Sequence, residues 1–288
     1  MKQEHFIVSP DTKIALKQYD SRYKGHFKDK SEAQHQLQEH IEHLKKHQEV
    51  LYAQNTFALL IVFQAMDAAG KDSTIKYVMS GVNPQGCQVF SFGVPSAEEL
   101  DHDYLWRYVK ALPERGRIGI FNRSYYEEAL VVRVHPELLD RQQLPPEVKT
   151  NKIWLSRFQE INNFEKYLFQ NGIVILKFFL NVSQGEQKKR FLDRINRPEK
   201  NWKFSVNDIK ERAYWNKYVQ AYEDIFNHTS TEWAPWYIIP ADHKWFTRLV
   251  VSDIICHRLI SLKLSYPKVS EAHKKQLLQA KKSLIINN

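Results

Sequence analysis

The sequence predicts an α/β fold with three layers, in which helices cover both faces of a parallel sheet. Short, almost continuously apolar runs alternate with longer segments whose apolar residues recur at helical spacing, and strands buried on both faces are typical of parallel sheets. The first of these runs, 57–64, leads into a turn of small residues at 65–70 and then into a helix, which is the layout of a phosphate-binding loop. A chain of 288 residues with 43% hydrophobic content is long enough to build one large domain around such a sheet.

The N-terminal segment 1–30 is polar and rich in lysine, and we expect it to form an irregular basic arm. A helix is predicted at 31–53 with Ser31 as its N-cap, because serine is favoured at that position and the apolar residues that follow recur at helical spacing. This apolar stripe consists of Leu37, Ile41, Leu44 and Leu51.

The rest of the chain alternates between strands and helices. Further strands are expected at 88–92, 117–122, 172–181 and 236–240. The clearest of them is the fourth strand of the chain, a run of branched and aromatic residues that follows a glycine. Helices are expected at 72–80, 98–112, 125–134, 153–171, 188–197, 206–227 and 245–262. We therefore expect a single domain over 31–268 and a polar, lysine-rich tail at 269–288.

The net charge of the chain indicates which kinds of molecule it is expected to bind. The net charge is +9 and the isoelectric point is about 9.3, so the chain favours a polyanion: nucleic acid, an anionic membrane or a phosphate-rich substrate. The longest apolar run, 57–63, is far too short to cross a bilayer, and the first residues lack an apolar signal core. Cys87 and Cys256 form no CxxC motif or disulfide framework, which predicts a reducing, cytoplasmic location.

The phosphate-binding loop departs from the usual pattern G-x-x-x-x-G-K-[ST]. Ala65 replaces the first glycine, and Asp72 stands where the first hydroxyl is expected, whereas Gly70 and Lys71 match. The lysine would reach the outer phosphates at a helix N-terminus that favours negative charge. The other residues expected to bind phosphate here are Ala68, Ala69, Gly70, Asp72, Ser73, Thr74 and Lys76. The alternative is an ordinary strand–turn–helix corner with a surface lysine.

Asp67 is unusual inside such a loop. A carboxylate beside a polyphosphate repels it unless a magnesium ion lies between them, so we interpret Asp67 as a metal ligand or as a residue that orients the nucleophile. The alternative is an aspartate that stabilises the turn.

A second group of polar residues follows the strand 117–122. Asn122 and Arg123 come at its carboxyl end, where ligands bind in parallel sheets, and the arginine suits a phosphate contact. Glu127 and Glu128 follow one helical turn later, and at least one of them should face the same cleft. We expect Glu128 to be a second contact to the metal or nucleophile, although a carboxylate on a helix is often simply solvated.

Basic residues in two further places are candidates for phosphate binding. Arg133 lies later on the helix predicted at 125–134 and is the weaker candidate. The segment 188–197 carries a basic helix face, which is either solvated or part of a lid that closes on phosphates. Its residues are Lys189, Arg190, Arg194 and Arg197.

Five segments, in this order, resemble the type 2 polyphosphate kinases. They are QAMDAAGKDSTI (64–75), PSAEELDHDYLWR (95–107), GRIGIFNRSYYEEALVVRVHPE (116–137), KKRFLDRINRPEKNWKFS (188–205) and WYIIPADHKWFTRLVV (236–251). The resemblance covers roughly residues 30–265. It implies a P-loop, thymidylate-kinase-like core over 31–268 with a helical lid at about 183–232. It also implies Mg²⁺-dependent transfer between inorganic polyphosphate and a nucleotide, in a homo-oligomer such as a dimer or tetramer.

The resemblance assigns roles by position. Asp67 is similar to the loop aspartate that serves magnesium and the nucleotide, Lys71 to the loop lysine, and Arg123 to the arginine that follows the second motif strand, with Arg190 and Arg194 in the lid. Many members have aspartate where this chain has Asn122, so Glu128 is expected to supply part of the missing charge. The acceptor is thus AMP, ADP or both, with ATP as product and guanine nucleotides left open.

Two other functions compete with this interpretation. The first is an ATP-dependent nucleoside monophosphate kinase on the same fold. The second is a basic nucleic-acid-binding protein, which is disfavoured because the cations cluster in the phosphate motifs instead of a known nucleic-acid module. We therefore expect neither nucleic acid nor membrane as a partner. Within the polyphosphate interpretation, the chain's charge would hold the substrate, with Lys24, Lys28, Lys30 and Lys76 as candidates for its groove.

Overall fold

A computed structural model describes residues 3–286. Its centre is one six-stranded sheet in the order β1-β6-β5-β2-β4-β3, in which β1 pairs antiparallel with β6 and every other pair is parallel. The strands are β1 (Ile7–Val8), β2 (Ala58–Ala65), β3 (Cys87–Ser91), β4 (Ile118–Asn122), β5 (Ile173–Asn181) and β6 (Trp236–Pro240). The predicted parallel α/β sheet is thus confirmed, and the antiparallel edge strand is an addition to it.

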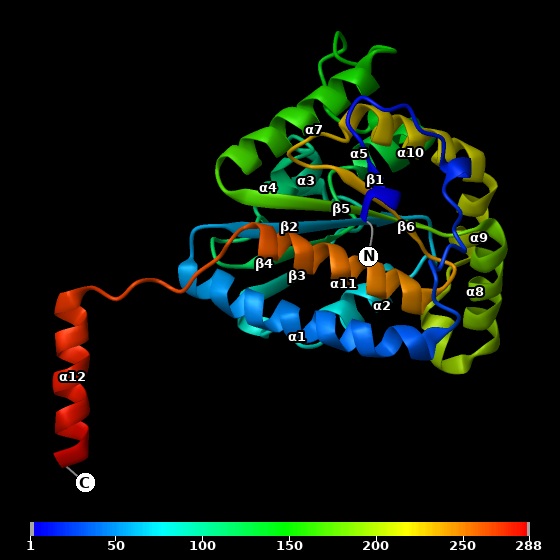
Figure 1. The fold of residues 1–288 in the computed structure, drawn as a ribbon. Coiled ribbons are helices and arrows are strands. Elements are labelled where there is room, and N and C mark those ends of the chain that lie inside the picture. The colour runs from blue at the N-terminus through cyan, green and yellow to red at the C-terminus, as the bar shows by residue number, and fades with distance from the viewer. Residues whose placement is uncertain (1–2, 287–288) are drawn as a thin grey trace.

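Helices cover the sheet on both faces, as Figure 1 shows. One face carries α1 (Lys30–Gln54), α2 (Lys71–Val78) and α11 (Lys244–Ser261), which pack against one another. The other face carries α5 (Glu127–Val134), α7 (Ile153–Gln170) and α10 (Trp215–Thr229). Helices therefore bury both faces of the sheet. This explains why the strands are apolar along most of their length and do not alternate between apolar and polar residues.

The segment predicted as a lid divides into two parts. Helices α8 (Gln184–Asn196) and α9 (Val206–Ala213), joined by the 3₁₀ helix η4 (Pro198–Lys203), lie at one end of the sheet, on the right of Figure 1. The third helix of the segment, α10, packs against α5 and α7 and belongs to the body. Only the stretch from α8 to α9 is therefore placed to cover a ligand at the sheet edge.

The remaining elements are short or stand apart. They are α3 (Ala97–Leu100), α4 (Trp106–Val109), α6 (Glu137–Asp140), α12 (Glu271–Ile286) and the 3₁₀ helices η1 (Gln3–His5), η2 (Leu16–Gln18) and η3 (Pro84–Gly86). Helix α12 extends away from the body at the end of an extended linker (Figure 1). Within residues 3–286, no helix is long and apolar enough to span a bilayer.

Three sequence expectations about these elements need correction. The helix expected at 98–112 is two short helices, because the Asp103 carboxylate accepts a hydrogen bond from the Leu105 N–H (2.9 Å) and begins a new turn. The helix expected at 206–227 is interrupted at Tyr214. The N-cap of α1 is Asp29, whose side chain accepts from the N–H groups of residues 31 and 32, and not Ser31.

The N-terminal segment is also less irregular than expected. Residues 7 and 8 pair with β6, and Phe6 and Val8 are buried. The apolar residues of this segment thus fasten it to the sheet edge, while its lysines are not part of that contact.

Strand β2 places the phosphate-binding loop. It lies between β5 and β4, and Leu59, Leu60, Ile61 and Val62 are fully buried. Because β2 is central, the loop that follows it emerges in the middle of the sheet's carboxyl edge, with the ends of neighbouring strands on either side.

The turn before β4 offers a test of the fold. Gly116 has a φ of +78°, and an added Cβ would lie 3.1 Å from the Tyr52 carbonyl oxygen. Its N–H donates to the Phe57 carbonyl (2.6 Å), so the turn cannot relax freely. We expect Gly116→Ala to lower the free energy of unfolding by about 1–3 kcal/mol, measured by urea denaturation. The control is Gly93→Ala, since an added Cβ at Gly93 would have no atom within 4 Å. This variant should change the free energy of unfolding by less than about 0.5 kcal/mol. An equal loss of stability in the two variants would contradict the explanation.

Candidate active site

A cavity of about 800 Å³ lies at the carboxyl edge of the sheet. Its walls come from the loop at 67–73, the ends of β3 and β4, the stretch from α8 to α9, and the start of α11. The predicted phosphate-binding loop and the predicted polar pair after β4 therefore meet in one cavity, as the edge rule for parallel sheets requires.

The loop is held through its carbonyl groups. Gln187 Nε2 donates to the Asp67 carbonyl (3.0 Å), and Arg190 donates to the carbonyls of Ala68 (3.0 Å) and Ala69 (2.6 Å). Ala68 and Gly70 adopt positive φ values of 59° and 109°. Because a trans peptide directs its N–H opposite to its C=O, the N–H groups of residues 68–70 point away from these side chains. The Ala69 N–H donates to the Met66 carbonyl within the turn (3.3 Å), so the N–H groups of Ala68 and Gly70 are the part of the loop suited to an anion.

Arg190 has a different position from the one expected. It is only 6% exposed, and besides the two loop carbonyls it donates to the carbonyls of Ala241 and Asp242 and to the Glu186 carboxylate. A guanidinium has five N–H groups, and these five bonds occupy them. Arg190 therefore fixes the loop to the β6–α11 connection, and it is not a free cation that closes onto phosphates.

Lys71 lies under the loop. Its Nζ donates to the Ala65 carbonyl oxygen (3.3 Å). Burial lowers its pKa, Arg123 adds to this effect, and the carboxylates around it oppose it. A phosphate group beside Lys71 would favour the charged form and replace the lost hydration.

Arg123 has a strained backbone. Its φ is +66°, a region that non-glycine residues occupy at a cost of about 1–3 kcal/mol. Its Nη2 lies 3.4 Å from Asp67 Oδ1, and its pKa is raised, chiefly by Glu127 and to a smaller extent by Asp67. Such strain is typical of a side chain that the surrounding structure holds in place for function.

Asn122 connects three elements at the edge. Its Nδ2 donates to Asp72 Oδ1 (2.8 Å) and lies 3.3 Å from Ser91 Oγ. These contacts join the end of β4 to the start of α2 and the end of β3. Asp72, an anomaly in the loop pattern, thus has a defined partner inside the cavity.

Neither glutamate of α5 lines the cavity, and the two have different partners. Glu127 accepts a hydrogen bond from the buried Gln64 amide (2.9 Å) and acts electrostatically on Arg123. Glu128 is buried between α5 and α7, where it accepts from Arg157 Nε (3.1 Å) and from Gln142 Nε2 (2.8 Å). Burial raises the pKa of Glu128 while Arg157 opposes the rise. Glu128 thus faces away from the cavity, and the expectation that it contacts a metal or the nucleophile is wrong.

Several predicted phosphate contacts lie outside the cavity lining. Arg133 is engaged with Asp224 of α10 through an ion pair, and Thr74 is buried. The other side chains outside the lining are Lys76, Lys189 and Arg197. Of the four basic residues expected to share a face of α8, Arg190 and Arg194 line the cavity, whereas Lys189 and Arg197 do not.

Arg194, like Arg190, is a predicted lid residue that lines the cavity. It lies 3.6 Å from Asp208 and donates to the Lys203 carbonyl (3.2 Å). Ser73 also lines the cavity, and its hydroxyl donates to the Gly70 carbonyl (2.9 Å).

Sequence reasoning missed nine residues of the lining, among them three lysines and a tryptophan. Lys200, Trp202 and Lys203 come from η4, and Lys244 begins α11. Burial lowers the pKa of Lys244, and the neighbouring charges of Arg190 and Lys200 add to this effect. Lys244 could have been predicted, because it follows the parallel strand β6 by four residues and ligands bind at the carboxyl ends of parallel strands. The η4 residues carry no comparable signal.

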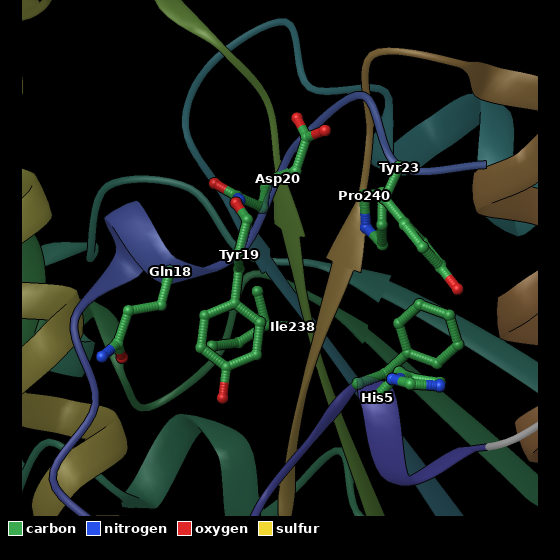
Figure 2. Close-up of a pocket in the computed structure, with 9 residues that line it drawn as sticks. His5, Gln18, Tyr19, Asp20, Tyr23, Ile238 and Pro240 are labelled. Carbon is green, nitrogen blue, oxygen red and sulfur yellow. The ribbon is translucent and has the colours of Figure 1, made fainter. Parts of the chain in front are cut away.

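A second, smaller cavity of about 210 Å³ lies between the N-terminal segment and β6. Figure 2 shows Tyr19 beside Ile238, and Tyr23 beside Pro240. Among the described residues that line it there is no lysine or arginine. It therefore lacks the charge that a phosphate site requires, and the edge cavity remains the candidate active site.

Comparison with known proteins points to one family. The family description "Polyphosphate kinase 2 (PPK2)" matches residues 27–265. An ADP-polyphosphate phosphotransferase from Rhodopseudomonas palustris is 49% identical over 286 residues, which is 99% of each chain. An AMP/ADP-polyphosphate phosphotransferase from Meiothermus ruber is 42% identical over 278 residues, covering 95% of this chain and 99% of that one. The crystal structure of a polyphosphate kinase 2 from Arthrobacter aurescens TC1 superposes with a TM-score of 0.85 at 34% identity, covering 95% of this chain and 98% of that one.

The anchoring of the loop by Arg190 can be measured directly. In Arg190→Lys an ammonium replaces a guanidinium that joins two loops, and it cannot reach both. We expect amide hydrogen exchange in 65–71 and 240–243 to rise at least about tenfold, since a hydrogen bond from a charged group contributes roughly 1.5–3 kcal/mol. Lys189→Ala, whose side chain is 80% exposed, should leave exchange in both segments unchanged. Unaltered exchange in Arg190→Lys would remove the anchoring role.

Proposed function

Because the chain belongs to the polyphosphate kinase 2 family, we propose that it transfers the terminal phosphate of inorganic polyphosphate to ADP, AMP or both, reversibly. The observation that carries this proposal is the single edge cavity, which joins a phosphate-binding loop to the Asn122–Arg123 pair and to a cationic wall. The relatives named for this activity align over nearly the whole chain, with coverage of 99% and 95%, so the proposal rests on more than the phosphate-binding loop.

The reaction is a direct, in-line displacement. An oxygen of the nucleotide's terminal phosphate attacks the end phosphorus of polyphosphate, and the P–O bond to the next phosphate breaks, leaving the chain one unit shorter. Such a transfer needs alignment and stabilisation of charge on the equatorial oxygens. Lys71 and Arg123, which both interact electrostatically with Asp67, supply positive charge where that charge spreads.

No phosphohistidine intermediate is needed. His102 stacks on Trp106, with ring centroids 3.9 Å apart, and His135 Nε2 lies 2.9 Å from the Glu211 carboxylate. Both histidines have structural partners outside the cavity lining, which agrees with direct transfer.

The cationic wall suits the polyphosphate chain. Arg194, Lys200, Lys203 and Lys244 line the side of the cavity formed by the lid stretch and α11. We propose that they neutralise successive phosphates, while the loop holds the reacting end. A string of separate charges binds a polyanion largely irrespective of its length.

The donor atoms in the cavity fit magnesium. The carboxylates of Asp67 and Asp72 line the same cavity, and Mg²⁺ prefers one or two carboxylates together with substrate phosphates and water. Among residues 3–286, no three His, Cys, Asp or Glu side chains gather closely enough to hold a metal alone, so phosphates would complete the coordination. We propose Asp67 and Asp72 as the protein ligands; when bound, the ion would neutralise charge on the phosphates.

The choice of acceptor rests on the Asn122 side of the cavity. Asn122 is neutral and donates to Asp72, so neither AMP nor ADP meets at this position the repulsion that an aspartate would produce. We propose that both AMP and ADP are accepted. A homo-oligomer and a cytoplasmic location complete the proposal, the latter in keeping with free thiols at Cys87 and Cys256.

The deciding experiment mixes the purified protein with Mg²⁺ and long-chain polyphosphate, adds AMP or ADP, and separates the nucleotides by ion-exchange chromatography. ATP formed from ADP supports the proposal, and ADP followed by ATP from AMP supports a dual acceptor. If neither nucleotide changes while ATP phosphorylates a nucleoside monophosphate, the protein is instead an ATP-dependent nucleotide kinase.

Lys71→Ala should abolish most transfer. Removing one preorganised donor to developing charge typically costs roughly 100- to 1,000-fold in kcat, and Lys71 is the cation that lies under the loop. The rate of ATP formation from ADP and polyphosphate measures this loss. Retained activity would reject the assignment of the loop, provided that circular dichroism shows an unchanged fold.

The metal assignment predicts opposite behaviour for two carboxylates. Asp67→Asn should raise the Mg²⁺ concentration for half-maximal activity at least about tenfold, a loss typical of even an outer-shell partner. Glu128→Gln should leave that concentration unchanged but lower thermal stability, because Arg157 loses its buried counter-charge. A raised Mg²⁺ requirement in Glu128→Gln would restore the role first expected of that residue.

A further inference from the structure

A fully buried polar cluster lies on the far side of Arg123 from the cavity. Glu165 of α7 and Lys177 of β5 are both 0% exposed and form an ion pair of 2.7 Å. Tyr125 and Tyr126 donate their hydroxyl hydrogens to Glu165 Oε1, at 2.8 and 2.9 Å. The described contacts thus join a strand, a helix and the turn that leads from β4 into α5.

The cluster is complete in its hydrogen bonding. Lys177 Nζ donates to Glu165 Oε2 (2.7 Å), to the Tyr126 hydroxyl (2.9 Å) and to the Thr229 carbonyl at the end of α10 (2.7 Å). An ammonium has three hydrogens, and each has an acceptor. A network satisfied in this way is rigid, because any displacement leaves a buried charge without a partner.

Stability alone does not explain such a cluster. Burial acts against both charges, raising the pKa of Glu165 and lowering that of Lys177, while the ion pair opposes each change. A well-packed apolar pair of similar volume is often at least as stabilising as a buried ion pair. The property that the polar cluster adds is a fixed geometry for the atoms it binds.

Those atoms belong to the turn that carries Arg123. Tyr125 and Tyr126 follow Arg123 by two and three residues, and the Tyr126 N–H lies 3.3 Å from Ser124 Oγ. On the other side, the Arg123 N–H donates to the Phe63 carbonyl of β2 (3.0 Å). The strained residue is thus fixed from both directions: by the sheet before it and by two anchored tyrosines after it.

We propose that Glu165, held by Lys177, is a positioning residue for phosphoryl transfer, fixing the turn 122–126 so that Arg123 and Asn122 face the phosphate-binding loop. The proposal rests on the function proposed above. Glu165 touches no substrate; it acts through Tyr125 and Tyr126. Its effect should fall on kcat, because Arg123 is needed most where charge spreads in the transition state.

The first test is Glu165→Gln, assayed with polyphosphate and ADP at a temperature where the variant is folded. The amide places N–H hydrogens against Lys177 or against the tyrosine hydroxyls, so one side of the cluster is left unmatched. We expect kcat to fall at least tenfold, with the KM values for ADP and polyphosphate within twofold of those of the unmodified protein. An unchanged kcat would overturn the proposal.

Tyr126→Phe is the milder variant, for use if Glu165→Gln does not fold. It removes one hydroxyl and keeps the ring, and we expect kcat to fall about three- to tenfold with unchanged KM values, since one neutral hydrogen bond contributes about 1 kcal/mol. Asp253→Asn is the matched control. It alters a carboxylate that is also buried and accepts a hydrogen bond from Gln3, but on α11 at the other face of the sheet, and kcat should not change.

The double variant Glu165→Met with Lys177→Met separates positioning from stability. The apolar pair removes both buried charges but leaves the Tyr125 and Tyr126 hydroxyls and the Thr229 carbonyl without their partners, so thermal stability should recover only in part while kcat remains low. Recovery of kcat together with stability would show that the cluster only supports the fold. If the unmodified protein itself transfers no phosphate, the proposed function fails, and this inference fails with it; a normal kcat in Glu165→Gln would overturn the inference alone.

Discussion

The guanidinium of Arg190 is the interaction on which the geometry of the edge cavity depends. A loop that binds anions through its N–H groups has to direct its carbonyls elsewhere, and buried carbonyls need donors. Arg190 supplies them to Ala68 and Ala69 on one side and to Ala241 and Asp242 on the other. Since it belongs to α8, the same contact fixes the base of the lid stretch to the loop. A lid that closes over a substrate would therefore have to move beyond Arg190, in the second half of α8, η4 and α9.

The charges around the loop are of both signs, and they partly balance one another when no polyanion is bound. Asp67 and Glu127 both act electrostatically on Lys71 and on Arg123, and they oppose the repulsion between these two cations. Arg123 Nη2 and Asp67 Oδ1 are 3.4 Å apart. This long ion pair is weak, so phosphate oxygens can replace the carboxylate as the partner of Arg123. Burial already lowers the pKa of Lys71, and an incoming phosphate restores the environment that favours its charge. The site thus exchanges weak internal ion pairs for stronger contacts to its substrate.

The sequence was sufficient for the parts of the site that follow a strand. The loop after β2 and the pair after β4 were predicted because a parallel sheet brings carboxyl ends together whatever the side chains are. Residues on helices were harder. Helical spacing places four basic residues on roughly the same side of α8: Lys189, Arg190, Arg194 and Arg197. It does not predict which of them is buried, because that depends on contacts with loop carbonyls, and no sequence pattern indicates these contacts. The N-cap of α1, in contrast, is a local signal: Asp29 is the cap, and the prediction placed it two residues too late, at Ser31.

The two glutamates of α5 show how contacts with other elements determine the direction in which each residue of a helix points. Successive residues of a helix point about 100° apart, so Glu127 and Glu128 cannot both face the cavity. Gln64, fully buried on β2, donates to Glu127, while Arg157 on α7 binds Glu128. The rotation of α5 is therefore set by partners on two other elements, one in the sheet and one in the helix layer. Because Gln64 restrains its carboxylate, Glu127 is a fixed counter-charge for Arg123. The buried polar contacts on both sides of α5 therefore determine where the Arg123 side chain points.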